Sequence, residues 1–356
     1  MALVNILELL HPNEQTDESV DVSESIADTW LARDTPYLPH RVNAANETIP
    51  YRLGELFPPA DTALVCEGPR TIVAPASPGV PMFLGSLEGF VLRGGTYWAE
   101  APVVLAEEAF RCRFEDLSLV KLLDVGFDLG LVGDVVFRDV ECFQGFASPL
   151  GTGIRVGGGV GLRIAECKFQ EIDEGVVLLG VSSELSSVTV RGTWFERITK
   201  PGVRAGAGVH GLSIVDSYFE SNGGTRDGDV ELNAHGGVGG ASATIAGCTF
   251  GGVGSSRPAR VVHGEHVSLV ARDNLALLAI GATGIGIPFV AAGGGLEGVA
   301  MWLLRNRLNA DHVKPSQHCE TLHPDYAAAC IELELHTLSR FMAGTTSLCG
   351  ATCSSP

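Results

Sequence analysis

The sequence has 356 residues, 45 of them glycine, and its hydrophobic content is 45%. This is more glycine than an average globular protein contains, with enough apolar residues for a large core, which indicates many turns around buried β structure. The 24 basic and 42 acidic residues give a formal net charge of −18. So acidic a surface repels phosphate backbones and anionic lipid head groups, which argues against nucleic-acid binding.

The N-terminal segment predicts a short helix near residues 21–33. Asp21 and Ser23 are candidate N-caps, and Ile26, Trp30 and Leu31 fall on one helix face. We expect this helix to cover an open strand edge, which would otherwise favour aggregation. The opening residues MALVNILELLHPNEQ lack a basic segment followed by an apolar core, so we expect synthesis in a cytoplasm without a signal peptide.

Five segments follow one another near the N-terminus: VNILELL, DVSESIADTWLA, TPYLPHRV, FPPADTALVCEGPRTIVAP and GFVLRGGTYW. Taken in this order, they resemble the entry region of the pectate-lyase-like β-helix superfamily, in the form found in phage tailspikes. The resemblance covers most of residues 4–98. It implies a parallel β-helix that begins with a helix cap. Because this scaffold hosts lyases, hydrolases, epimerases and inert fibres, the resemblance favours a fold more strongly than an activity.

A phenylalanine then recurs at steps of 29, 26, 26, 24 and 31 residues, a period typical of stacked structural units. Around it lie alternating runs such as GLRIAECKF and SSVTVRGTWF, which predict short strands with every second side chain facing inward. The framework of leucine-rich repeats is absent, so we predict an all-β parallel β-helix, right-handed by the rule for parallel crossovers. The predicted inner column comprises Phe114, Phe143, Phe169, Phe195, Phe219 and Phe250.

Three parts are therefore predicted. Residues 1–98 form the entry region and helix cap, residues 99–310 form the β-helix coils, and residues 311–356 form a C-terminal cap or trimerisation segment. The stretch from Asn274 to Leu296 has no charged residue. A membrane span is one interpretation, but its six glycines favour a coil buried against a partner subunit, and we expect no membrane insertion.

The cysteines form two groups. Cys112, Cys142, Cys167 and Cys248 precede repeat phenylalanines, which predicts small buried thiols. Cys319, Cys330, Cys349 and Cys353 lie beyond the repeats, where they could pair, bind metal or remain free. The spacing HCETLH does not match a standard zinc pattern, so we predict no metal site and no cofactor.

The residue after each inward phenylalanine should face outward. This alternation predicts an outer column of Glu115, Gln144, Gln170, Glu196, Glu220 and Gly251. Neighbouring coils are about 4.8 Å apart, so Glu196 and Glu220 would form a carboxylate pair near the roughly 5 Å separation of retaining glycosidases. The alternative is a polar ladder that keeps the surface hydrated.

Aromatic side chains accompany this predicted pair. Trp194 and Tyr218 precede inward phenylalanines and should lie outside on adjacent coils, where their rings could stack on sugars. Asp229 and Glu231 follow a glycine-rich loop and are further candidate acids, although a solvated turn also explains them. The candidate catalytic residues are thus Glu196, Glu220, Asp229 and Glu231, with Trp194 and Tyr218 for substrate binding.

The resemblance to tailspikes implies a virion tailspike or tail-fibre protein that binds, and in an active form depolymerises, a host surface polysaccharide. It also implies a homotrimer in the virion tail, with other tail proteins as partners. If the protein is an enzyme, the carboxylate pair favours a glycoside hydrolase over a lyase. The alternatives are a cellular polysaccharide-processing β-helix enzyme (hydrolase, lyase or epimerase) and a non-catalytic structural spike.

Overall fold

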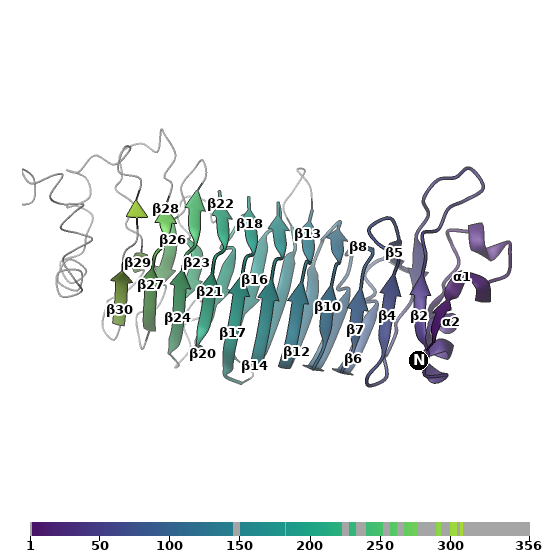
Figure 1. Cartoon of the computed structure of the whole chain (residues 1–356), viewed down its shortest axis with the longest axis horizontal. Helices are drawn as coiled ribbons and strands as arrows, with labels where there is room; N and C mark the ends of the chain where they lie inside the picture. The colour runs from purple at the N-terminus through teal and green to yellow at the C-terminus, as the bar shows by residue number, and fades with distance from the viewer. Residues whose placement is uncertain are drawn as a thin grey trace, which may run out of the picture.

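The computed structural model describes residues 2–144, 150–181, 183–222, 228–232, 240–251, 257–261, 267–276, 290–292, 300–304 and 307–308. In these residues the chain forms an elongated right-handed parallel β-helix, with its helices at the N-terminal end (Figure 1). The predicted fold class is confirmed. The predicted segment 311–356, with its four cysteines, and most of the uncharged stretch 274–296 lie outside the described residues.

Two parallel sheets build the coils, because short alternating runs place every second side chain inside. The small sheet contains β3 (Tyr51–Leu53), β5 (Ile72–Pro75), β8 (Thr96–Trp98), β11 (Ser118–Val120), β13 (Glu141–Phe143), β15 (Lys168–Gln170), β18 (Trp194–Glu196), β22 (Tyr218–Glu220), β25 (Thr249–Gly251), β28 (Leu275–Ala276) and β31 (Arg307–Leu308).

The large sheet supplies the other faces of each coil. It contains β1 (Leu3–Asn5), β2 (Thr35–Leu38), β4 (Ala63–Cys66), β6 (Phe83–Glu88), β7 (Val91–Arg93), β9 (Val104–Phe110), β10 (Arg113–Glu115), β12 (Val125–Arg138), β14 (Thr152–Ala165), β16 (Glu174–Leu178), β17 (Leu185–Arg191), β19 (Val203–Ala205), β20 (Val209–His210), β21 (Leu212–Val215), β23 (Gly228–Leu232), β24 (Ala241–Ala246), β26 (Arg257–Val261), β27 (Val267–Arg272), β29 (Val290–Ala292) and β30 (Ala300–Leu304).

A stack of aromatic rings fills the core beneath the small sheet. Phe169, Phe195, Phe219 and Phe250 follow one another at centroid distances of 5.2, 4.8 and 4.9 Å, with nearly parallel ring planes. All four are buried. Gly175 faces this stack, and a Cβ there would lie 2.4 Å from the carbonyl oxygen of Gly202. The rings are therefore accommodated by a position that only glycine fits.

The prediction that Phe114 and Phe143 belong to this column was wrong. Phe114 lies on β10 of the large sheet, in register with Phe137 of β12. In β13 the residue paired with Phe169 is Cys142, and Phe143 is paired with Gln170. Because side-chain direction alternates along a strand, this shift of one residue turns Phe143 to the outer face.

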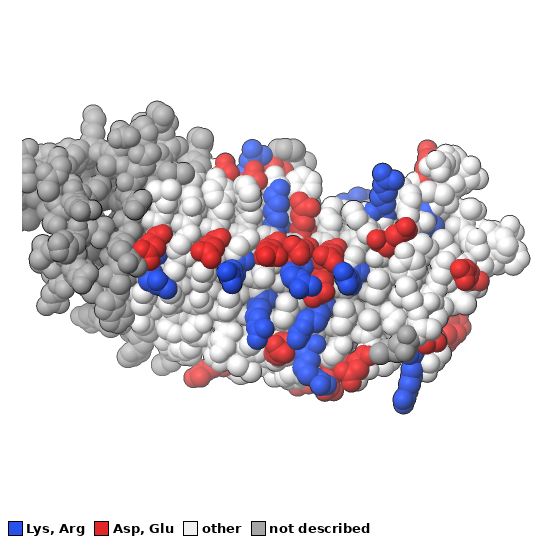
Figure 2. Space-filling model, viewed as in Figure 1, with Lys and Arg blue, Asp and Glu red and all other residues white. Residues whose placement is uncertain are grey.

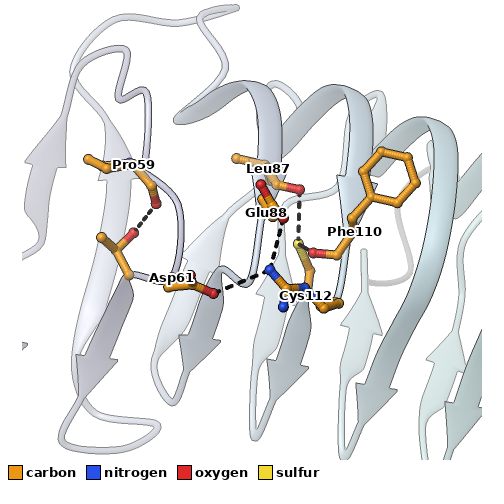
Figure 3. Close-up of polar contacts among 8 residues, drawn as sticks. Pro59, Asp61, Leu87, Glu88, Phe110 and Cys112 are labelled. Atoms are coloured by element: carbon orange, nitrogen blue, oxygen red, sulfur yellow. Dashed lines mark hydrogen bonds and ion pairs between the residues drawn. The ribbon is translucent and has the colours of Figure 1, made fainter.

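The cysteines of the described part fill gaps in the core. Cys66, Cys112, Cys142, Cys167 and Cys248 are buried free thiols, as predicted for the last four. Burial raises the pKa of the Cys167 thiol to about 12, which disfavours the reactive thiolate. Figure 3 shows the Cys112 thiol directed at backbone, where it donates to the carbonyl oxygen of Phe110 at 3.4 Å.

Each coil turns at three corners, and the corner residues have positive φ. In the corner that leads into the small sheet these are Asp116, Asp139, Glu166, Gly192, Asp216, Gly247 and Asp273, with φ between 51 and 66°. The amides of the first six of these residues donate to the next coil, as when Asp116 N donates to Arg138 O at 3.1 Å. These bonds offset a left-handed conformation that costs a non-glycine residue roughly 1–2 kcal/mol.

Charged side chains follow the solenoid axis in rows (Figure 2). Arg93 pairs with Asp116 of the next coil at 3.1 Å, and Arg111 pairs with Glu88 at 2.8 Å and Asp61 at 3.7 Å (Figure 3). All these side chains are more than 40% exposed, so each pair adds at most about 1 kcal/mol. These ion pairs connect successive coils but contribute little to the free energy of unfolding.

The N-terminal end is closed by α1 (Ile6–Leu9), the 3₁₀ helix η1 (Glu14–Thr16) and α2 (Ser23–Leu31). Ile26 and Trp30 are buried as predicted, and Trp30 Nε1 donates to Ala63 O at 2.8 Å. Leu31 is exposed, contrary to prediction, because it lies on the outer side of the last turn. The N-cap position belongs to Val22, which makes no side-chain cap bond. The described residues include no helix of the length and apolarity that a bilayer span requires.

One buried arginine joins this cap to the first coil. The Arg41 side chain is 1% exposed and donates hydrogen bonds to the carbonyl oxygens of Glu14, Gln15, Asp17 and Pro50. Its guanidinium also lies 5.2 Å from the ring centroid of Tyr51. Burial lowers the pKa of Arg41 from its usual value, since desolvation disfavours the charge.

Candidate functional site

Two rows of side chains line the outer face of the small sheet, because each short strand turns its middle residue inward. The first outer row consists of the first strand residues, and the second outer row of the third residues. In chain order the first outer row is Thr96, Ser118, Glu141, Lys168, Trp194, Tyr218 and Thr249, and the second outer row is Trp98, Val120, Phe143, Gln170, Glu196, Glu220 and Gly251.

An aromatic pair lies in the first outer row, as predicted from the sequence. Trp194 of β18 and Tyr218 of β22 are in register, and their ring centroids are 4.7 Å apart in an edge-to-face arrangement. Trp194 is 45% exposed, which is high for so large an apolar side chain. An exposed aromatic surface held by a neighbouring ring is suited to stack on the apolar face of a sugar.

The predicted carboxylate pair lies beside these rings. Glu196 and Glu220 are in register on β18 and β22, so their backbones are about 4.8 Å apart. Glu196 lies 3.7 Å from Arg197, while Glu220 accepts a hydrogen bond of 3.1 Å from the Tyr218 hydroxyl. Burial, followed by the bond to Glu220, raises the pKa of Tyr218. The two carboxylates therefore have different neighbours, a cation and a phenol.

Two other residues predicted for the outer column, Glu115 and Gln144, do not lie in it. Glu115 lies on β10 of the large sheet and pairs with Arg138 at 3.0 Å. Gln144 follows the end of β13, and Phe143 occupies the outer position in register with Gln170. The sequence prediction did not place Phe143 on the outer face, because aligning the repeats assigned its ring to the core.

The structure separates the other two candidate acids from the glutamate pair. Asp229 and Glu231 belong to β23, in the large sheet rather than the small one. Asp229 is buried and accepts a 3.0 Å hydrogen bond from Asn222 Nδ2, which explains how its carboxylate is held. Glu231 is nearly buried and is in register with Arg204 of β19.

A network of ion pairs that sequence reasoning did not find joins successive coils near the corner where the chain leaves the small sheet. Arg197 binds Glu171 at 2.8 Å, Lys200 binds Asp173 at 2.6 Å, and Arg204 pairs with Glu174. The bond to Asp173 raises the pKa of Lys200. The available signal was spacing, because each cation follows its acid by about one coil. In the part of the chain that the structure describes, no group of three or more His, Cys, Asp or Glu is placed to hold a metal ion.

No protein-family model matches the sequence, and no curated protein matches it. Solved structures with a similar fold include ORF18 of Geobacillus virus E2, with a TM-score of 0.59, 12% identity, and coverage of 87% of this chain and 62% of that one. The chain thus spans less than two thirds of the viral protein.

Two further solved structures are matched over nearly their whole length. The endo-xylogalacturonan hydrolase from Aspergillus tubingensis has a TM-score of 0.57 and 12% identity, with coverage of 88% of this chain and 95% of that one. The A-module of mannuronan C-5 epimerase AlgE4 from Azotobacter vinelandii has a TM-score of 0.54 and 12% identity, with coverage of 85% and 95%. At these identities the likeness establishes the β-helix fold.

Proposed function

We propose that this protein binds a polysaccharide of neutral sugars on the outer face of β18 and β22. The observation that carries the proposal is the exposed Trp194 ring packed against Tyr218, directly beside Glu196 and Glu220. Aromatic rings supply apolar stacking area, and carboxylates accept hydrogen bonds from sugar hydroxyls. The net charge of −18 disfavours a polyanionic ligand.

A phage tailspike or tail-fibre role is the setting we propose for this binding. The tailspike-like entry region and the fold shared with a protein of Geobacillus virus E2 support it. In this setting the chain is a homotrimer in the virion tail, attached to other tail proteins, and its ligand is a host surface polysaccharide. Sedimentation of the purified chain as a monomer would argue against this assembly.

Replacing Trp194 by alanine is expected to weaken binding to the polysaccharide about tenfold, because stacking contributes roughly 1 kcal/mol or more. Isothermal titration with polysaccharide purified from the host cell surface measures the change. Trp98 provides a matched control on the same sheet, since the Lys121 ammonium already lies 3.4 Å from its ring centroid. Equal losses in Trp194→Ala and Trp98→Ala would contradict a specific platform at Trp194.

Hydrolysis of the bound polysaccharide is a second candidate function, favoured by the register of Glu196 with Glu220. Two carboxylates at this spacing suit a retaining glycosidase, in which one acts as nucleophile and the other as general acid. Changing either residue to glutamine keeps its shape and should lower the release of reducing ends about a hundredfold or more. Unchanged rates in both variants would show that these residues serve binding alone.

A further inference from the structure

The second outer row continues beyond the glutamate pair toward the N-terminus. Phe143, Gln170, Glu196 and Glu220 are consecutive register partners on β13, β15, β18 and β22. All four side chains are partly exposed. The row thus presents an apolar ring, an amide and two carboxylates along the solenoid axis, a mixture of stacking and hydrogen-bonding groups that suits a saccharide.

Phe143 is the least expected member of this row. The inner position of its strand is filled by Cys142, so the ring has no place in the aromatic stack of the core. One strand further, at Val120, the row becomes aliphatic, and at Trp98 the ring face is covered by Lys121. Phe143 is therefore the aromatic ring of the second outer row nearest to Trp194, and it is partly exposed.

The spacing of these groups matches a polymer that lies along the axis. Neighbouring strands are about 4.8 Å apart, close to the length that one sugar residue adds to an extended chain. Phe143 on β13 and Trp194 on β18 are two coils apart, so the two rings would contact sugar residues two positions apart. The four strands from β13 to β22 provide room for four sugar residues.

We infer that the polysaccharide runs parallel to the solenoid axis across β13, β15, β18 and β22, and that Phe143 forms a second aromatic subsite. This inference rests on the proposed function. Gln170 lies between the two rings and offers an amide donor and acceptor to the intervening sugar. The site therefore recognises a neutral tetrasaccharide as its unit, not a single sugar.

Binding to an array of neutral oligosaccharides, printed in length series from two to six sugar residues, tests this inference. The intact protein should gain about tenfold in affinity between two and four residues and little beyond four, because the second ring is reached only by the longer chains. Phe143→Ala should abolish that gain while leaving binding of the short oligosaccharides unchanged. Phe110→Ala, at a 39% exposed ring on β9, is the matched control and should behave as the unchanged protein.

The outcomes separate the inference from the function on which it rests. If the protein binds the array but Phe143→Ala keeps the full length dependence, the axial path is wrong and the platform at Trp194 stands. If affinity does not depend on length, the same conclusion follows. If the intact protein binds no neutral oligosaccharide on the array, the proposed function fails, and the axial path fails with it.

Discussion

Replacing Phe195 by alanine is expected to destabilise the protein by about 3–5 kcal/mol, the usual cost of removing a buried aromatic side chain. The ring is fully buried between Phe169 and Phe219, at centroid distances of 5.2 and 4.8 Å. Its loss removes two stacking contacts and leaves a cavity that the backbone hydrogen bonds of adjacent coils keep from collapsing. The midpoint of urea denaturation, followed by circular dichroism, measures the change.

The neighbouring residue supplies the control for this experiment. Trp194 lies on the same strand but faces outward, where it loses only its contact with Tyr218, so Trp194→Ala should change stability by about 1 kcal/mol or less. A similar midpoint for the two variants would mean that the stack does not hold the coils together. Comparison of the pair thus separates the role of the inner face from that of the outer face.

Replacing Arg41 by methionine is expected to cost about 3 kcal/mol or more, because this buried side chain donates hydrogen bonds to four backbone carbonyl oxygens. Methionine fills much of the volume but donates nothing. The carbonyl oxygens of Gln15 and Pro50 lose the arginine as donor, while those of Glu14 and Asp17 keep a backbone amide. Each buried carbonyl left without a partner costs roughly 1–3 kcal/mol, and those that reach water cost less.

Hydrogen exchange measures where this effect falls. Amides in residues 14–17 and 51–53 should exchange faster in Arg41→Met, because the side chain holds the first segment against the second. Arg70→Met, at an exposed position, is the control and should exchange as the unchanged protein does. Protection that stays the same in both variants would show that the cap is held by α2 and its apolar contacts alone.

The fold was predictable because its signal repeats. Phe169, Phe195, Phe219 and Phe250 are correctly aligned from the sequence, and every repetition strengthens the evidence for the same column. Phe143 was misplaced because Cys-Phe-Gln resembles the other repeats, while the strand is displaced by one residue. Local sequence cannot distinguish a buried cysteine beside an exposed phenylalanine from the reverse, and only the register of neighbouring strands does so.

The candidate site was predictable to the same extent. Alternation along one strand places Trp194 and Glu196 outside, and the repeat period brings Tyr218 and Glu220 beside them. The separation of Asp229 from this group depends on the path of the chain after β22, which a period does not specify. The pairing of Arg197 with Glu171 similarly depends on corner geometry, since both residues have positive φ.

The corners also determine how this molecule could change in length. Glu166 and Gly192 occupy the same corner of successive coils, with φ of 57 and 58°, and the preceding Ala165 and Arg191 are in register. A chain without residues 166–191 would re-enter at an equivalent backbone position, whereas loss of one residue would turn core side chains outward. The natural unit of variation is therefore a whole coil, which would shift every group beyond it by about 4.8 Å without altering its neighbours on the same coil.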